Sequence, residues 1–334
     1  MTQAATENTI QSSEQAKFSI LRDRLRDSII GQEKMLERIL IALLADGHLL
    51  VEGAPGLAKT RAINVLGKNV EGEFKRIQFT PDLLPSDLTG TDVFRPQDGQ
   101  FSFRKGPLFH SLILADEINR APAKVQSALL EAMGERQISV SGTTYTLPEL
   151  FLVMATQNPI EQEGTYSLPE AQLDRFLMHI KVDYPDALTE KKILKCIQQE
   201  EKVLSSQKEN NPQHVLSQKS IFMARNEVLN VYMSDELENY LIAVVLSTRN
   251  PGAYNKEFEN LLEFGASPRA TISLDRCARA RAWLDGRNFV TPDDIQELAH
   301  DVLRHRMGLS YEAEAQNISK DKVISMLLEH IAVP

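Results

Sequence analysis

The first half of the chain alternates short apolar runs with stretches of helical periodicity. The apolar runs are residues 48–53, 74–80, 111–118, 150–158 and 176–183. Near-continuous apolar strands of this kind are typical of parallel sheets that are covered on both faces. Residues 32–46, 59–70 and 122–135 lie between them and repeat their apolar positions with helical spacing. The pattern predicts an α/β domain built on a parallel sheet.

Two stretches interrupt this alternation with the pattern of a β-hairpin. Residues 92–105 place Asp98-Gly99 between alternating segments, and residues 136–148 alternate in the same way around Ser141-Gly142. Alternating segments joined by such a pair are a strong short-range signal for a hairpin. From the pattern alone, both hairpins could also be plain surface decoration.

The second half of the chain has a different periodicity. From Thr189 onward the apolar spacing is helical, so we expect the strands to stop at a boundary near Pro185. The prediction is therefore an α/β domain over residues 16–185 and an all-α domain over residues 186–334. The first 18 residues are polar and lack an apolar signal core, so residues 1–15 are expected to form a disordered tail.

Composition limits the partners and the compartment. The net charge is −9 and the chain has no dense block of Lys and Arg, which argues against nucleic acid as a partner. No run of about 18 apolar residues occurs, so no membrane span is expected. Cys196 and Cys277 form neither a C-x-x-C pair nor a disulfide framework. Together with the polar N-terminus, this favours the cytoplasm.

The segment VEGAPGLAKT (51–60) follows an apolar run and precedes a helical one. It resembles the phosphate loop G-x-x-x-x-G-K-[ST], with Gly53 first and Lys59-Thr60 last. Lys59 would reach the β and γ phosphates, and the Thr60 hydroxyl would ligate Mg²⁺. Ala58 replaces the last Gly, and we expect its methyl group to have no conformational cost in the first helical turn. A chance glycine-rich turn is the alternative.

Two further strands end in polar residues. Asp116-Glu117 ends the third run, where open α/β sheets bind ligands. Asp116 would hold Mg²⁺ through water, while Glu117 would polarise the attacking water. Acids that simply begin a helix are the alternative. Asn158 ends the fourth run and could contact the γ-phosphate or orient the water, although Asn before Pro is also a common turn opener.

These motifs together resemble the MoxR family of AAA+ ATPases. The resemblance is carried by GAPGLAKT, IQFTPDLLPSDLTGT, GPLF, LADEINRAP, VMATQNPIEQEGTYSLPEAQLDRF and GASPRA, between about residues 30 and 270. It implies a three-layer α/β/α domain with a five-stranded parallel sheet and a helical lid. The hairpins would be the family's helix-2 and pre-sensor-1 inserts, on the pore side of a ring. Ala58 matches the family's loop, G-x-P-G-x-A-K-T.

The resemblance also implies a role for individual residues. Lys59 and Thr60 would belong to Walker A, Asp116 and Glu117 to Walker B, and Asn158 to sensor 1. Arg175 would be the arginine finger that completes a neighbour's site, and Arg269 would be sensor 2 on the lid. An Arg before an apolar strand can also simply cap helix carbonyls. The expected catalytic residues are Glu117, Asn158, Arg175 and Arg269, and the expected metal ligands are Thr60 and Asp116. The expected nucleotide-binding residues are Ile30, Gln32, Gly53, Ala54, Pro55, Gly56, Leu57, Ala58, Lys59, Thr60, Arg61 and Arg269.

The function implied by the resemblance is that of an ATP hydrolase. It would bind ATP or ADP with Mg²⁺ in a homo-oligomeric ring, expected to be a hexamer, and act as a chaperone-like remodelling or maturation factor for protein complexes. Von Willebrand factor A-domain proteins are possible partners. A nucleic-acid motor is the main alternative, because some AAA+ motors carry similar hairpins, but the hairpins here are poor in Lys. A nucleotide-gated switch without turnover is a third reading, and the presence of Glu117 and Arg175 argues against it.

Overall fold

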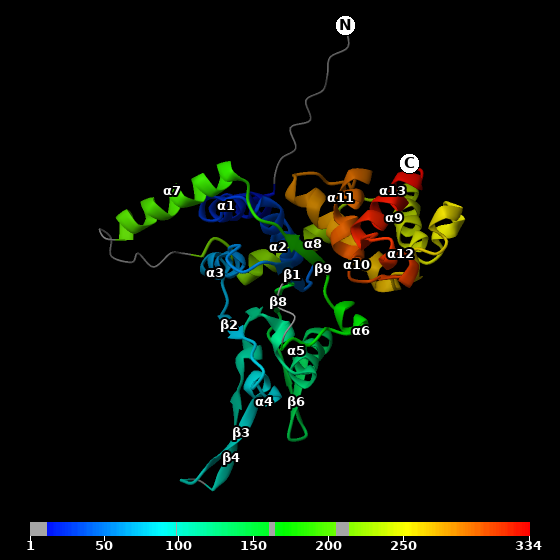
Figure 1. Cartoon of the computed structure of the whole chain (residues 1–334). Coiled ribbons are helices and arrows are strands. Elements are labelled where there is room, and N and C mark those ends of the chain that lie inside the picture. Colours follow the sequence, from blue (N-terminus) through cyan, green and yellow to red (C-terminus); the bar gives the residue numbers. More distant parts are fainter. Residues whose placement is uncertain (1–11, 98, 160–163, 205–213) are drawn as a thin grey trace.

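A five-stranded parallel sheet forms the centre of the protein (Figure 1). The computed structural model describes residues 12–97, 99–159, 164–204 and 214–334. The sheet has the order β2-β5-β8-β1-β9. Its strands are β1 (Leu49–Gly53), β2 (Phe74–Gln78), β5 (Leu112–Asp116), β8 (Leu152–Gln157) and β9 (Met178–Val182). Each of the five apolar runs in the sequence contains one of these strands, and the predicted parallel sheet is confirmed.

Helices cover both faces of the sheet because its central strands are apolar on both sides. In β1, Leu49 and Val51 point into one core and Leu50 into the other. The first core contains α1 (Ser13–Ser28), α2 (Glu33–Leu44) and α3 (Lys59–Asn69). The second contains α4 (Pro85–Thr89) and α5 (Ala123–Glu135). The predicted three-layer α/β/α architecture is therefore confirmed.

Both predicted hairpins are present. The first pairs β3 (Gly90–Arg95) with β4 (Gln100–Lys105) and extends far from the sheet (Figure 1). The second pairs β6 (Gln137–Val140) with β7 (Thr143–Thr146). Its turn residues Ser141 and Gly142 have φ of 49° and 81°, as a tight hairpin turn requires. In the first turn Gly99 has φ 63°, while Asp98 lies outside the described residues.

An aromatic cluster joins the two hairpins. The ring of Phe103 in β4 stacks on that of Tyr145 in β7, with centroids 4.1 Å apart and planes 18° apart. Phe109, in the short 3-10 helix η1 (Pro107–Phe109) before β5, packs edge-on against both rings. The two inserts therefore contact each other and the segment that leads into the strand of Asp116.

The N-terminal helix was missed by the sequence interpretation. Helix α1 begins at Ser13, inside the range expected to be a tail. Ser12 accepts from the Gln15 backbone, and the Gln15 side chain accepts from the Ser12 backbone, which is a capping box. The signal Ser-x-x-Gln was present in the sequence, but the polar residues around it concealed the buried positions Phe18, Leu21 and Leu25.

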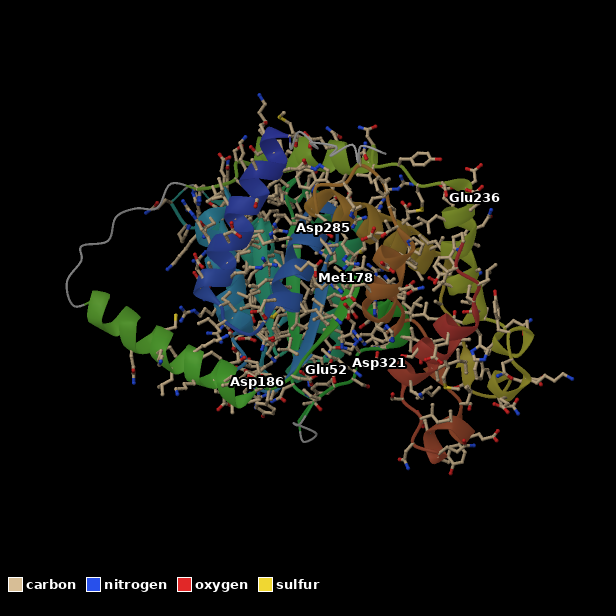
Figure 2. The ribbon with its side chains drawn as sticks, turned by 90° about the horizontal axis from the view of Figure 1, so that it is seen from above. Glu52, Met178, Asp186, Glu236, Asp285 and Asp321 are labelled. Carbon is tan, nitrogen blue, oxygen red and sulfur yellow. The ribbon has the colours of Figure 1, made fainter. Side chains whose placement is uncertain are left out.

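The C-terminal half is helical, as predicted. Its helices are α7 (Ala187–Leu204), α8 (Gln218–Leu229), α9 (Asp235–Ser247), α10 (Pro268–Leu284), α11 (Pro292–Leu303), α12 (Tyr311–Ala315) and α13 (Lys320–His330). The expectation that strands stop near Pro185 is wrong in one place, because β10 (Leu262–Phe264) pairs with β11 (Gly308–Leu309). Figure 2 shows α7 leaving the body beside Asp186, on the side opposite to Glu236 at the start of α9.

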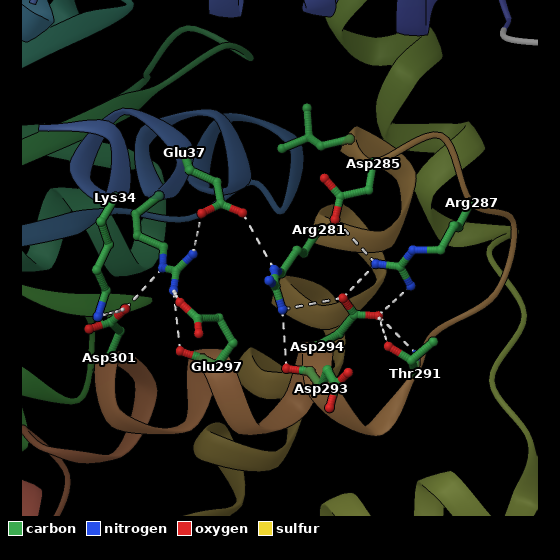
Figure 3. Close-up of polar contacts among 12 residues, drawn as sticks. Lys34, Glu37, Arg281, Asp285, Arg287, Thr291, Asp293, Asp294, Glu297 and Asp301 are labelled. Atoms are coloured by element: carbon green, nitrogen blue, oxygen red, sulfur yellow. Dashed lines mark hydrogen bonds and ion pairs between the residues drawn. The ribbon is translucent and has the colours of Figure 1, made fainter. Parts of the chain in front are cut away.

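A buried charge network joins the lid helices to α2 (Figure 3). Arg38 in α2 is fully buried, and its Nε donates to Asp301 Oδ2 of α11 at 2.9 Å. Its Nη2 donates to Glu297 Oε1 at 2.9 Å. Asp301 is also fully buried, and its Oδ1 accepts a hydrogen bond from Arg304 Nη1 at 2.7 Å. The first hydrophobic core likewise runs without a break from α2 into α8, α10 and α11, so the lid is packed on the α/β domain by both apolar and charged contacts.

Candidate nucleotide-binding site

The loop between β1 and α3 has the geometry of a phosphate cradle. Lys59 is the first residue of α3, and its Nζ donates to Gly53 O at 2.6 Å across the loop. Burial lowers the pKa of the Lys59 amine, while Asp116 and Glu117 oppose that shift. Gly56 has φ 85°, and no described atom lies within 4 Å of the position of a Cβ there. The loop therefore encloses open space, with a lysine ammonium group at its edge.

Ala58 has a conformational cost that the sequence did not predict. It is the residue before α3 and lies in the left-handed region, with φ 56° and ψ 12°. A left-handed conformation brings Cβ close to the following carbonyl and costs roughly 1–2 kcal/mol for a residue with a side chain. The expectation of a cost-free methyl group is therefore wrong, because residue 58 lies outside the first helical turn.

Asp116 and Glu117 lie at the carboxyl end of β5 and share one hydroxyl group. Thr156 Oγ1, in the neighbouring strand β8, donates to Asp116 Oδ1 at 2.6 Å. The same oxygen accepts from the Glu117 backbone N–H at 2.9 Å. Glu117 itself has φ 57° and, among the described residues, makes no side-chain cap to the helix that follows. The geometry thus gives no support to the reading of this pair as helix-opening acids.

Residues of β2 hold both carboxylates from the other side. Arg76 Nε and Nη2 donate to Asp116 Oδ2 at 3.1 and 2.7 Å. Gln78 Nε2 donates to Glu117 Oε2 at 2.7 Å, and Arg120 Nη1 donates to the same oxygen at 3.0 Å. Sequence reasoning missed Arg76, Gln78 and Thr156. The sequence feature that could have indicated them is the presence of polar side chains in β2 and β8, the strands that flank β5.

These side chains line one cavity of about 330 Å³. Its lining is Pro55, Gly56, Leu57, Ala58, Lys59, Thr60, Arg76, Asp116, Glu117, Thr156 and Asn158. The structure therefore brings together residues predicted from three separate segments of the chain. Gly53 and Ala54 are buried and do not line this cavity, and a Cβ on Gly53 would come within 2.6 Å of Val182 O in β9.

A second cavity, of about 220 Å³, shares Gly56, Leu57 and Ala58 with the first and is mainly apolar. The predicted residues Ile30, Gln32 and Arg61 line it. Helix α7 supplies Ile193, Cys196 and Ile197, which sequence reasoning did not find. A flat apolar group attached to a phosphate chain would fit the pair of cavities.

The two predicted arginines lie elsewhere. Among the described residues, Arg175 and Arg269 line a third cavity of about 320 Å³ and neither lines the first two. Arg175 Nη1 donates to Leu130 O of α5 at 2.6 Å, which is the helix-carbonyl contact considered as the alternative for this residue. The Arg269 side chain is 60% exposed, and its Nη1 lies 3.8 Å from Asp174 Oδ2. Within one chain, the arginines are not brought to the phosphate loop.

Comparison with known proteins agrees with the fold and the loop. Residues 48–178 match the ATPase family associated with various cellular activities (AAA), and residues 256–327 match the AAA lid domain. The chain is 43% identical over 328 residues to "Chaperone MoxR1" of Mycobacterium tuberculosis, covering 97% of this chain and 83% of that protein. It is 30% identical over 322 residues to "Protein MoxR" of Methylorubrum extorquens, covering 92% of each. A crystal structure from Cytophaga hutchinsonii superposes with a TM-score of 0.87 at 46% identity, covering 96% of each chain.

The parallel sheet, the phosphate loop and the helical lid define the AAA class of ATPases. Within that class, the chain belongs to the MoxR family of AAA+ ATPases. In the part of the chain that is described, no helix is long and apolar enough to cross a membrane.

Proposed function

We propose that this protein binds ATP with Mg²⁺ and hydrolyses it between the subunits of a homo-oligomeric ring, expected to be a hexamer. The observation that carries the proposal is the convergence of Lys59, Asp116, Glu117 and Asn158 on one cavity. A phosphate-binding group, two carboxylates and an amide at the carboxyl edge of a parallel sheet are the groups that phosphoryl transfer needs.

The residues present fit a nucleotide with its metal. Backbone N–H groups of the loop and the N-terminus of α3 would hold phosphate oxygens, and the buried Lys59 ammonium would neutralise them. The Thr60 hydroxyl and the Asp116 carboxylate line the same cavity and are oxygen ligands of the kind that Mg²⁺ prefers, with Asp116 acting through water. Bound Mg²⁺ would supply charge neutralisation on the phosphates. Ile30 and Gln32 would hold the base in the apolar cavity.

Glu117 is proposed to orient and deprotonate the attacking water. Gln78 and Arg120 both donate to its Oε2, which fixes the carboxylate at the edge of the cavity. Asn158 lines the same cavity and would contact the water or the γ-phosphate. Two donors to one oxygen fix the direction of the carboxylate, and a general base must lie within hydrogen-bond reach of the proton that it removes.

Arg175 and Arg269 are proposed to act together. A phosphoryl-transfer transition state is stabilised by guanidinium charge beyond the metal and the lysine. Since both arginines line one cavity, a neighbouring subunit that docks there would bring its γ-phosphate near both. This placement supports a site shared between subunits.

The work done with ATP is proposed to be remodelling or maturation of protein complexes in the cytoplasm. The relative from Mycobacterium tuberculosis is named "Chaperone MoxR1", which supports this reading. Clients that contain a von Willebrand factor A domain are part of the proposal. A nucleic-acid motor is the second candidate, with the protruding hairpin β3–β4 as its only structural support.

Two substitutions with matched controls test the proposal. Lys59→Ala should abolish ATP binding, whereas Lys68→Ala, on an exposed position of the same helix, should bind ATP normally. Glu117→Gln should bind ATP and lose turnover, whereas Glu329→Gln, exposed on α13, should turn over normally. Nucleotide titration and single-turnover hydrolysis measure both. Normal single-turnover hydrolysis by Glu117→Gln would remove Glu117 from the chemistry.

A pull-down with Glu117→Gln and ATP tests the output. It should retain a protein client that wild type releases. ATPase assays with single-stranded and duplex DNA distinguish the second candidate, because a nucleic-acid motor should be stimulated several-fold by one of them.

A further inference from the structure

One carboxylate, that of Asp174, lies between the two arginines of the third cavity. Asp174 follows the short helix α6 (Glu170–Leu173) and directly precedes Arg175. Its Oδ1 accepts from Arg306 Nε at 2.8 Å. Its Oδ2 accepts from Ser267 Oγ at 3.0 Å and lies 3.8 Å from Arg269 Nη1. Both oxygens are thus directed at residues of the lid.

Arg306 anchors the same stretch of backbone on the far side of Arg175. Its side chain is only 2% exposed. Nη2 donates to Phe176 O at 2.6 Å, and Nη1 donates to Leu177 O at 3.1 Å. Burial lowers the pKa of Arg306, and the negative charge of Asp174 opposes that shift. A buried guanidinium needs such an ionised partner, so Asp174 and Arg306 fix each other.

We propose that Asp174 is a positioning residue that fixes Arg175 and Arg269 on one cavity and couples both to the lid through Arg306 and Ser267. The inference rests on the proposed shared site. Arg175 is held because the residues on both sides of it are bonded to Arg306. Arg269 is held because its guanidinium faces Asp174 Oδ2, and its backbone N–H donates to Ser267 Oγ at 3.2 Å.

The substitution Asp174→Asn removes the charge of this side chain and keeps its shape. Asp174→Asn keeps the volume and one acceptor oxygen but places an NH₂ group where the second oxygen was. If the oxygen stays with Arg306, the NH₂ faces Ser267 and the Arg269 guanidinium, which are both donors in this arrangement. The amide therefore cannot hold both arginines as the carboxylate does.

The test compares Asp174→Asn with Asp183→Asn, an exposed aspartate just after β9. We expect Asp174→Asn to lower ATP turnover about 10–100-fold, the size of effect that a small misplacement of catalytic groups causes. Its affinity for a fluorescent ATP analogue should stay within about twofold of wild type, because the phosphate loop is untouched. Asp183→Asn should match wild type in both. Normal turnover by Asp174→Asn beside a slow Arg175→Ala would overturn the inference and leave the proposed function intact.

Two further variants separate positioning from folding. Asp174→Glu keeps the charge beside Arg306 and therefore the fold, but moves the carboxylate by one methylene, and it should also be slow. In an Arg175→Ala Arg269→Ala background, Asp174→Asn should change turnover by less than about twofold, because the groups it positions are gone. A full additional loss in that background would show a role in folding alone. Wild-type turnover by the Arg175→Ala Arg269→Ala protein would overturn the shared site itself, and this inference with it.

Discussion

Replacing Arg38 by methionine should loosen the lid from the α/β domain. Methionine fills much of the volume of the buried side chain but removes the donors to Asp301 and Glu297. Asp301, which is fully buried, would retain Arg304 at 2.7 Å and the exposed Lys34 at 3.5 Å. One of its two buried positive partners would be lost.

The size of the effect follows from that partial loss. Removing one partner of a buried ion pair costs roughly 3–5 kcal/mol, and the remaining Arg304 favours the lower end, about 3 kcal/mol. At roughly 2.1 cal/mol/K per residue, a chain of 334 residues unfolds with an entropy of about 0.7 kcal/mol/K. The melting temperature should therefore fall by about 4 °C.

The chain offers a matched control for this experiment. Lys34 lies on the same helix and contacts the same Asp301 oxygen, but its side chain is 51% exposed. An exposed pair is worth at most about 1 kcal/mol, so Lys34→Met should shift the melting temperature by about 1.5 °C or less. Calorimetry or circular dichroism measures both variants at one protein concentration.

The same network predicts a dependence on pH. Burial alone would raise the pKa of Asp301, but Arg304 and Arg38 outweigh it and hold the pKa below its ordinary value of 3.8. A carboxylate with a depressed pKa contributes stability above its unfolded pKa and loses it as pH falls through the folded value. The difference in melting temperature between wild type and Arg38→Met should have its full size above about pH 5 and become smaller below pH 3.8. Equal melting temperatures for Arg38→Met and Lys34→Met at pH 7 would refute this account of the lid contact.

Three further predictions concern the loop, the shared site and the hairpins. Ala58→Gly should relieve the strain of the left-handed conformation and raise the free energy of unfolding by about 0.5–1 kcal/mol, after the entropy cost of glycine is subtracted. Its ATP affinity should stay within about twofold of wild type. A lower melting temperature would contradict the left-handed conformation of residue 58. Arg175→Ala should bind ATP and hydrolyse it about 10³–10⁵-fold more slowly than wild type. Mixing this protein with Lys59→Ala should restore part of the ATPase activity. If the subunits exchange and no activity is recovered, the site is complete in one chain. Tyr145→Ala should speed amide exchange in the other hairpin, formed by β3 and β4, by about 2–10-fold, because an aromatic pair is worth about 0.5–1.5 kcal/mol. Thr144→Ala, in the same strand as Tyr145, should leave that exchange unchanged.

The sheet could be predicted because its central strands are buried on both faces, so that their apolar runs are continuous. Strand β2 lies at the edge of the sheet and carries Arg76 and Gln78, and their contacts with Asp116 and Glu117 depend on strand order. No pattern within one segment reveals which strand lies next to which. The phosphate loop, in contrast, could be predicted from the sequence because its residues are contiguous.

Two errors have different causes, the first local and the second a contact between distant residues. The cost at Ala58 depends on where α3 begins, and a shift of one residue moves position 58 from the helix into the left-handed turn before it. The pairing of β10 with β11 joins residues that are far apart in a region of helical spacing, and strands this short carry no periodicity of their own.

The position of α1 has a consequence for the order in which the chain folds. Phe18 packs edge-on against Trp283 at 5.3 Å, and Ser12 Oγ donates to Glu227 Oε2 across 215 positions of sequence. Part of the apolar face of α1 is therefore covered only after α8 and α10 have been synthesised. A nascent chain that stops near Pro185 would leave Phe18 without Trp283, so the two halves belong to one folding unit although their secondary structure differs.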